Sequence, residues 1–182
     1  MLYYSLAAIQ VQPYTLPDDG VYPGNPNFPV LFYADAVQFR DNAPEAALER
    51  LFSANGWTGW WTNGIYDYHH YHSISHEVLG VYAGEAQVQL GGPHGVILPF
   101  RKGDVMLIPA GVAHKCISST ADFGVVGAYP PGQENYDVLY GLADERPAAD
   151  GRIVAVALPE TDPVYGENGP MAAYWNPAYQ HV

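Results

Sequence analysis

Side chains that bind metal ions are concentrated in one short stretch of the chain, residues 63–84, NGIYDYHHYHSISHEVLGVYAG. Four histidines and one glutamate of this stretch fall within nine positions: His69, His70, His72, His76 and Glu77. Imidazole and carboxylate groups are common protein ligands of divalent transition metals. The stretch therefore indicates a metal site, provided that some of these side chains point to a common place.

The spacing of the histidines selects two of them. Side chains alternate across a β-strand, so residues two positions apart point to the same face. If this segment forms a strand, His70 and His72 share one face, whereas His69 points to the other. By the same rule, His76 points to the opposite face from Glu77. His69 or His76 can then hydrogen-bond to a metal-ligating side chain without binding the metal itself. A carboxylate and a third imidazole from neighbouring strands would complete a compact metal site.

The sequence after residue 56 is typical of a β protein, because short segments rich in β-branched and aromatic residues alternate with Gly-rich or Pro-rich turns. Seven segments are predicted strands: 64–73, 76–84, 85–92, 95–100, 104–111, 113–119 and 123–131. Short strands at this spacing are typical of a sandwich or a barrel. We therefore predict an all-β fold with its barrel core at about residues 57–130.

One helix is predicted beside this barrel, at residues 43–55. Asn42 is placed to cap its N-terminus, and Glu45 lies three residues further on, as in a capping box. The pair Asn55-Gly56 is expected to end the helix. Four apolar residues are spaced to form one buried face: Ala47, Leu48, Leu51 and Phe52.

Irregular arms are predicted at both ends of the barrel. Residues 13–29 carry five prolines, so the N-terminal arm, residues 1–29, is expected to be extended and irregular. Residues 30–39, VLFYADAVQF, are predicted to form a strand. The C-terminal part, residues 131–182, is expected to wrap over the barrel or onto a neighbouring subunit, with only 151–158, GRIVAVAL, as a strand. We expect the 182 residues to form a single domain.

Two spaced motifs resemble those of the cupin family. The first consists of Gly64, His70, His72, Glu77 and Gly84, and the second of Gly103, Pro109, Gly111 and His114. The second family motif usually ends in an asparagine that is not a metal ligand, and this chain has Ser118 there. So many fixed positions in the right order are more specific than a single HxH. The chain also resembles small bacterial single-domain cupins of the YjlB type, through NGIYDYHHYHS, HEVLGV, GGPHGV, GDVMLIPAGVAHK and VVGAYPPGQ.

The resemblance implies a jelly-roll barrel, the double-stranded β-helix, with the metal ligands pointing into its interior. It implies that His70, His72, Glu77 and His114 hold one mononuclear divalent metal ion. His114 enters through the resemblance alone, because strand parity does not select it. Three imidazoles and one carboxylate leave open positions on an octahedral ion, which suits Fe, Mn, Ni or Co, and Zn at lower coordination.

Six further residues are candidates for the wall of a pocket beside the metal: Cys116, Gln87, Gln89, Met106, Tyr68 and Tyr129. Cys116 shares the face of His114 if their strand is regular, and a buried filler is favoured over a reactive thiol. Gln87 and Gln89 either point inward to a ligand or lie on a solvated face. Met106 is expected in the pocket wall or in the core.

Aromatic residues gather before the first motif: Trp57, Trp60, Trp61, Tyr66 and Tyr68. Most are expected to pack in the core and at the rim of the barrel, and one or two, with Tyr68 a candidate, to line its mouth. Tyr129, which precedes the sequence PPGQ, is expected to frame the pocket entrance.

Charge and composition exclude several kinds of partner. The chain has a formal net charge of −12, which argues against nucleic acid and against an anionic membrane surface. One cysteine allows no intrachain disulfide, and there is neither a signal peptide pattern nor an 18-residue apolar stretch. We expect a cytoplasmic protein that forms a homodimer, with the N-terminal arm available for exchange onto a neighbour.

Two functions fit these features. The first is a metal-dependent enzyme acting on a small oxygen-bearing molecule; a dioxygenase-like oxidoreductase is favoured by analogy with the family, and an isomerase or decarboxylase is the alternative. The second is a non-catalytic module that binds a small ligand, with the metal as a structural or recognition element.

Overall fold

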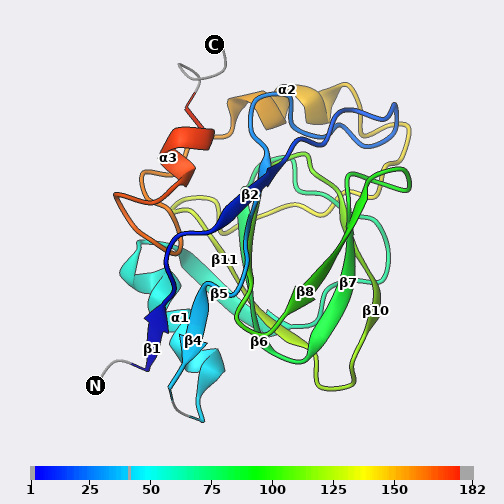
Figure 1. The fold of residues 1–182 in the computed structure, drawn as a ribbon. Helices are drawn as coiled ribbons and strands as arrows, with labels where there is room; N and C mark the ends of the chain where they lie inside the picture. Colours follow the sequence, from blue (N-terminus) through cyan, green and yellow to red (C-terminus); the bar gives the residue numbers. More distant parts are fainter. Residues whose placement is uncertain (1–2, 41, 177–182) are drawn as a thin grey trace.

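The computed structural model describes residues 3–40 and 42–176 (Figure 1). Its strands are β1 (Tyr4–Leu6), β2 (Val11–Tyr14), β3 (Val30–Tyr33), β4 (Val37–Phe39), β5 (Thr58–Asn63), β6 (Glu77–Ala83), β7 (Glu85–Leu90), β8 (Val96–Arg101), β9 (Val105–Ile108), β10 (His114–Ser119) and β11 (Gly124–Tyr129). Its helices are α1 (Pro44–Ala54), α2 (Ala148–Ala155) and α3 (Met171–Tyr174). The expected arms also include residues 1–2 and 177–182, which lie outside the described residues.

Antiparallel pairing gathers the strands into a barrel with two main sheets. The larger sheet runs in the order β2-β3-β9-β6-β11-β5 and the smaller in the order β10-β7-β8, while β1 and β4 pair separately. Apolar side chains from both main sheets, among them Leu79, Val88 and Phe100, meet in one buried cluster. The predicted all-β jelly roll is confirmed (Figure 1).

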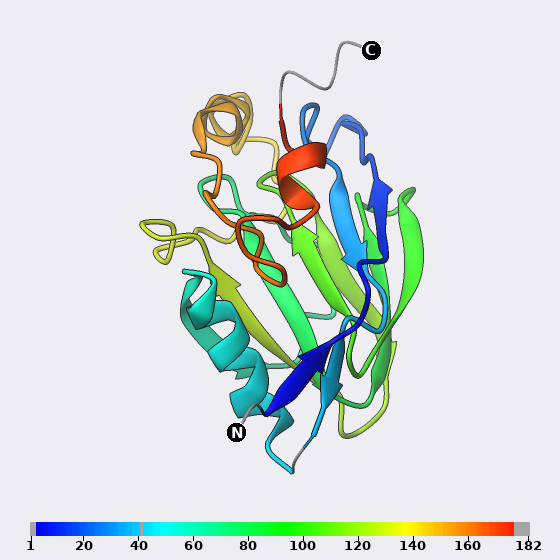
Figure 2. The same cartoon turned by 60° about the vertical axis from the view of Figure 1, so that its left-hand side comes forward.

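The central strands of the larger sheet are buried on both faces. On its outer face, Leu31 and Leu107 pack in one cluster with Phe52 of α1 and with Trp175 at the end of α3. Figure 2 shows α1 and the segment around α3 against the same side of this sheet. Strands covered on both faces need no polar side, which explains why β9 and β11 are buried at every residue.

Helix α1 lies close to the larger sheet because a glycine faces it. A Cβ atom at Gly80 of β6 would lie 3.0 Å from Leu48 Cδ2 and 3.0 Å from Phe52 Cζ. These two residues belong to the buried face that the sequence predicts for the helix. A side chain at position 80 would therefore push the helix away from the sheet.

The predicted capping residue of α1 is wrong. Ala43 is the N-cap and makes no side-chain capping hydrogen bond, and Pro44 is the first helical residue. Proline fits this position because its missing N–H would have no partner inside the helix. The helix thus begins one residue too late for Asn42 to cap it. At the other end Gly56 has a φ of +79°, a conformation that ends helices and favours glycine.

Two of the predicted strands have a different form in the structure. Residues 30–39 make two strands, because Asp35 has a φ of +48° and turns the chain between β3 and β4. Residues 64–73 form no regular strand; only His70 and Tyr71 make isolated bridges, to His114 and Leu139. The edge of the larger sheet is instead occupied by β5, immediately before this segment. The other six predicted strands are present as β6 to β11.

The predicted strand in the C-terminal wrap is also wrong, since residues 151–158 largely belong to helix α2. Ala149 and Ile153 lie four residues apart and are both buried, whereas Val154 is 66% exposed. One-sided burial with this spacing is helical, and it overrides the β-branched composition of the segment. None of the helices formed by the described residues is long and apolar enough to span a bilayer.

A buried aspartate fastens the C-terminal wrap to the barrel. Asp162 is 1% exposed, and its Oδ2 accepts hydrogen bonds from the Tyr33 hydroxyl at 2.7 Å and from the Met171 N–H at 3.1 Å. Its Oδ1 accepts from the N–H groups of Val164 and Tyr165 at 2.8 and 2.9 Å. A single carboxylate thus connects β3 to the turn and the helix of the wrap.

We expect Asp162→Ala to lower the free energy of unfolding by about 2–4 kcal/mol, because buried donors lose their acceptor. Urea denaturation monitored by circular dichroism measures this change. The matched control is Asp144→Ala, an exposed aspartate of the same wrap, which should stay within about 0.5 kcal/mol of the parent. A similar small change in both variants would contradict the anchoring role.

Candidate metal centre

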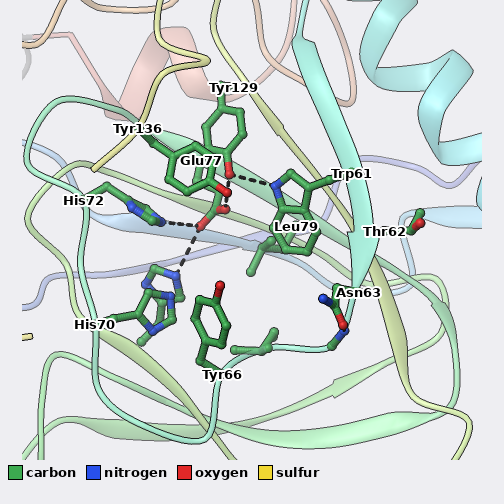
Figure 3. A pocket seen from close by; sticks show the side chains of 13 residues that line it. Trp61, Thr62, Asn63, Tyr66, His70, His72, Glu77, Leu79, Tyr129 and Tyr136 are labelled. Atoms are coloured by element: carbon green, nitrogen blue, oxygen red, sulfur yellow. Dashed lines mark hydrogen bonds and ion pairs between the residues drawn. The ribbon is translucent and has the colours of Figure 1, made fainter. Parts of the chain in front are cut away.

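Four potential metal ligands come from three elements of the barrel. His70 and His72 lie in the segment between β5 and β6, Glu77 is the first residue of β6, and His114 is the first residue of β10. The bridge between His70 and His114 joins two of these elements through backbone hydrogen bonds of 3.3 and 2.9 Å. All four residues are buried, with at most 5% of each exposed. Figure 3 shows His70, His72 and Glu77 together beside a cavity, which His114 also lines.

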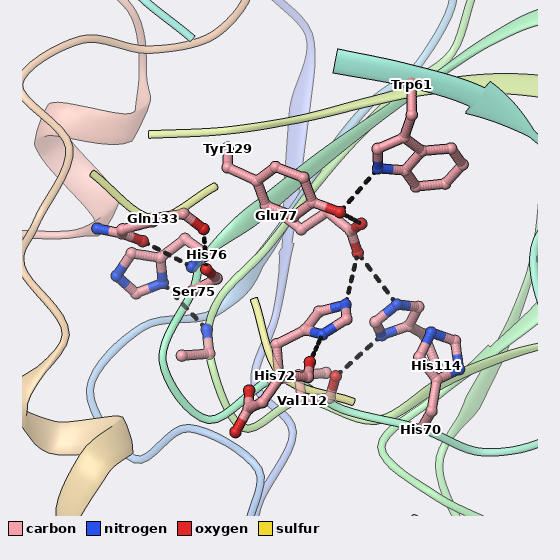
Figure 4. Close-up of polar contacts among 12 residues, drawn as sticks. Trp61, His70, His72, Ser75, His76, Glu77, Val112, His114, Tyr129 and Gln133 are labelled. Atoms are coloured by element: carbon pink, nitrogen blue, oxygen red, sulfur yellow. Dashed lines mark hydrogen bonds and ion pairs between the residues drawn. The ribbon is translucent and has the colours of Figure 1, made fainter. Parts of the chain in front are cut away.

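Each histidine is oriented by a backbone carbonyl. His70 Nδ1 lies 3.2 Å from the carbonyl oxygen of Tyr68, and His114 Nδ1 lies 3.1 Å from that of Val112. His72 Nδ1 makes the same contact with the carbonyl of Asp137 (Figure 4). A carbonyl only accepts hydrogen bonds, so each Nδ1 must carry a proton. In a neutral imidazole the other nitrogen, Nε2, then carries no proton. Its lone pair is free to bind a metal ion.

The three histidines gather their ligand atoms in one place, and two of them face one carboxylate oxygen. One ligand atom from each of the three histidines lies within 4.8 Å of the others. Glu77 Oε2 lies 3.3 Å from His72 Nε2 and 3.2 Å from His114 Nε2. This oxygen is buried and accepts no well-aligned hydrogen bond. Donor atoms bound at right angles to one ion are about 3 Å apart, so the residues present fit a divalent metal.

The other oxygen of Glu77 is held by an aromatic relay. The Tyr129 hydroxyl donates to Glu77 Oε1 at 3.1 Å, and Trp61 Nε1–H donates to the Tyr129 oxygen at 2.7 Å (Figure 4). Tyr129 is completely buried. The relay fixes the rotation of the carboxylate and leaves Oε2 directed at the histidines.

Burial and mutual charge set the protonation of the empty ligand set. Burial lowers the pKa of His70 to about 3, helped by neighbouring His114, so His70 is neutral at physiological pH. Burial alone would lower the pKa of His72, but the Glu77 carboxylate outweighs it and raises that pKa above its ordinary value. Burial would likewise raise the pKa of Glu77, but the nearby imidazoles of His72 and His114 outweigh it and hold that pKa well below its usual range. In the absence of a metal, these shifts favour a proton on His72 beside an ionised Glu77.

The two remaining histidines of the cluster lie away from the centre. The ring of His69 packs on Tyr22, with 5.4 Å between ring centroids. His76 Nδ1 accepts a hydrogen bond from the Ala110 N–H at 3.0 Å, and its ring lies 4.8 Å from that of Trp175. The alternation expected from strand parity thus describes the side-chain directions, although the segment is not a regular strand.

Among the predicted pocket residues, Tyr129 lines the cavity beside the four ligands. Gln87 and Gln89 do not, because they lie on the outer side of β7, where Gln87 is exposed and Gln89 Nε2 donates to the Pro93 carbonyl at 3.0 Å. Val88 between them points into the core instead. Of the two positions left open for the glutamines, the structure shows the solvated one.

Three other predicted pocket residues also lie outside the cavity wall. Met106 is fully buried among the core residues between the sheets. Cys116 shares this cluster and is 8% exposed, with its Sγ 3.5 Å from the Ser118 carbonyl oxygen. Tyr68 is 39% exposed and stacks on the outer side of Tyr66, with 4.8 Å between centroids.

The cavity next to the ligands has a volume of about 200 Å³. Residues that complete its wall include Trp61, Asn63, Ile65, Tyr66, Leu79 and Tyr136 (Figure 3). Two of them, Trp61 and Tyr66, belong to the aromatic cluster noted in the sequence. No pattern in the sequence marks Tyr136 or the orienting carbonyl of Asp137, since both lie in the irregular wrap.

Comparison with known proteins agrees with this geometry. Residues 63–143 match the family model described as cupin. YjlB of Bacillus subtilis (strain 168), described as an uncharacterized protein, is 42% identical over 166 residues, which cover 91% of this chain and 97% of that protein. The chain therefore belongs to the cupin family. Within that family it is a YjlB-like protein.

Several solved structures share part of the barrel. A structure reported for the DMSP lyases RdDddP and RnDddQII has 19% identity, covers 46% of this chain and 41% of its own, and gives a TM-score of 0.36. A double-stranded β-helix protein of Klebsiella pneumoniae subsp. pneumoniae MGH 78578 has 20% identity, covers 45% and 66%, and also gives 0.36. The epimerase RmlC of Legionella pneumophila Philadelphia 1 has 15% identity, covers 66% and 71%, and gives 0.35. At such identity the likeness concerns the fold alone.

The aromatic relay predicts a positioning role for the Tyr129 hydroxyl. We expect Tyr129→Phe to weaken metal binding about 10–100-fold, because Glu77 Oε1 loses its donor and the carboxylate is free to rotate. Competition with a chromophoric chelator measures the dissociation constant. Tyr140→Phe, at a tyrosine that is 49% exposed, is the matched control and should bind like the parent. Unchanged affinity in Tyr129→Phe would exclude the relay as a support of the ligand.

The protonation of His72 predicts that metal binding releases a proton. Below its raised pKa, His72 carries a proton on Nε2 that a metal must displace; above that pKa no proton competes. Affinity should therefore rise about tenfold per pH unit at acid pH and level off once the pH exceeds the pKa of His72. Calorimetry at about pH 6, in two buffers of different ionisation enthalpy, should count about one proton per metal. Binding without proton release at that pH would show that His72 is neutral in the free site.

Proposed function

We propose that the chain is a mononuclear divalent-metal enzyme of the dioxygenase-like oxidoreductase type, acting on a small oxygen-bearing molecule. The observation that supports it is the orientation of the ligand set. Three carbonyls orient His70, His72 and His114 beside a cavity, and the Nε2 atoms of His72 and His114 face Glu77 Oε2. Without a metal or a proton between them, these buried acceptors would face one another at an energetic cost.

The protein groups around the cavity have separate tasks under this proposal. A divalent ion, when bound, supplies a Lewis acid or redox centre with positions open to a substrate. Glu77 offsets part of its charge, while Trp61 and Tyr129 hold the carboxylate in place. The wrap contributes Tyr136, which lies with its ring 4.7 Å from Tyr129 and shields that side of the centre from water.

The wrap also holds the ligand segment in position. The Ser73 N–H donates to Asp137 Oδ1 at 2.7 Å, and the backbone carbonyl of the same aspartate orients His72. Further along, the His76 N–H donates to Gln133 Oε1 at 2.9 Å. These contacts keep the segment between β5 and β6 in the conformation that the site needs, although it lacks the support of a regular strand.

The first test of this proposal is the metal content of protein purified anaerobically without added metal. We expect about one equivalent of a divalent metal in the parent and a loss of most of it in His70→Ala, because one of four ligands is missing. His94→Ala removes an exposed histidine of the loop between β7 and β8 and is the matched control. It should retain the metal.

The identity of the metal then separates the reactions. Iron would support an oxygen-dependent enzyme and leads to measurements of oxygen uptake, whereas manganese, nickel or zinc would favour an isomerase or decarboxylase. Thermal unfolding with and without chelator shows whether His70→Ala is folded. If neither parent nor variant takes up metal after reconstitution, the four residues are a polar core and the proposal fails.

A further inference from the structure

The wall of the cavity differs in chemistry from its metal-binding side. Apart from the ligands, aromatic rings of Trp61, Tyr66, Tyr129 and Tyr136 dominate it, together with the apolar side chains of Ile65 and Leu79. Among the described residues that line it, none is a lysine or arginine, and Glu77 is the one acidic residue. A carboxylate or phosphate held away from the metal would therefore be desolvated here without a partner of opposite charge.

The rings of the wall are fixed by contacts with one another and with the ligands. Tyr136 is stacked on Tyr129, with an interplanar angle of 21°, and lies edge-on to His72 at 5.1 Å. Tyr66 lies edge-on to His70, with 5.0 Å between centroids and an angle of 78°. Figure 3 shows the rings of Trp61, Tyr66 and Tyr136 around the space next to Glu77 and His70. A planar guest next to the ligands would meet ring faces and edges in several directions, which favours an aromatic guest.

The size of the cavity limits the part of a guest that can be buried beside the ligands. An apolar cavity of about 150 Å³ is sufficient to hold one benzene molecule. The volume of about 200 Å³ found here accommodates one substituted six-membered ring. Outside the metal-binding side, the polar groups of the wall are the Asn63 carboxamide, the Thr62 hydroxyl and the tyrosine hydroxyls. They can bond a few groups of a guest, whereas a sugar carries a hydroxyl on most of its carbon atoms.

We infer that the substrate is a single aromatic ring with an oxygen donor for the metal, of the phenol or catechol class, and with no charged group at its far end. The inference rests on the proposed function, because the oxygen donor needs a metal to bind. The aromatic wall of the cavity, formed by Trp61, Tyr66, Tyr129 and Tyr136, supplies the remaining affinity through apolar burial and aromatic contacts. Tyr66 is the residue whose ring is expected to contact the guest without contributing to metal binding.

Two hydroxamates measure the contribution of the aromatic wall to affinity separately from that of the metal. Acetohydroxamate and benzohydroxamate share one chelating group and differ in the ring. We expect the metal-loaded protein to bind benzohydroxamate at least about tenfold more tightly than acetohydroxamate, as measured by calorimetry. 4-Carboxybenzohydroxamate, which adds a distal charge, should bind about tenfold more weakly than benzohydroxamate.

Variants of two tyrosines locate the effect. In Tyr66→Leu the preference for benzohydroxamate should fall at least about threefold, while the affinity for acetohydroxamate stays the same. Tyr140→Leu is the control, because Tyr66 and Tyr140 are 50% and 49% exposed and Tyr140 lies outside the cavity wall. It should behave like the parent.

Metal content is measured for each sample before titration, so that the two proposals fail in different ways. Protein that takes up no metal overturns the proposed function, and with it the substrate class. Protein that binds metal and both small hydroxamates equally well overturns the aromatic substrate alone. Tight binding of the carboxylated probe would contradict the requirement for an uncharged far end.

Discussion

Buried lone pairs that point at one another are the constraint on which the rest of this structure depends. Glu77 Oε2 faces the Nε2 atoms of His72 and His114 at 3.3 and 3.2 Å, and all three residues are buried. Such an arrangement is unstable unless a proton or a cation lies between the acceptors, and unless the backbone prevents the rings from turning away. The three carbonyls on the Nδ1 atoms prevent that rotation. The site is therefore preorganised by backbone groups, whose positions depend on the whole fold.

The fold supplies those positions from distant parts of the chain. Regular sheet pairing places Glu77 on β6, opposite Ile108 of β9, and places His114 at the start of β10. The segment that carries His72 has no such pairing and depends on the wrap, through the carbonyl of Asp137 and the side chain of Gln133. This division explains why a tail with little regular structure is packed so closely onto the barrel. Changes in the wrap are expected to act on the metal centre through His72.

Local sequence patterns describe the barrel well and the wrap poorly. Alternation predicts the shared direction of His70 and His72 because an extended backbone suffices for it, even where hydrogen bonding is limited to isolated bridges. The spaced motifs indicate His114 by resemblance, whereas parity alone does not. Helix α2 is not predicted because its β-branched residues favour a strand. In the structure, burial of Ile153 on one face stabilises a helix instead. Tyr136 escapes prediction because only tertiary packing brings it to the cavity.

The charge of the cavity is concentrated on its metal-binding side. The chain carries a net charge of −12, and the described residues of the cavity wall include no fixed cation. A bound divalent ion would then be the main positive charge near the substrate, only partly offset by Glu77. The metal would favour guest molecules with an oxygen donor that carries or develops negative charge. The rings of Trp61 and Tyr66 would select the shape of the rest of the guest. Under the proposed function, chemistry and specificity would be divided between the two sides of one small cavity, and a change in the wall would alter the substrate without removing the metal.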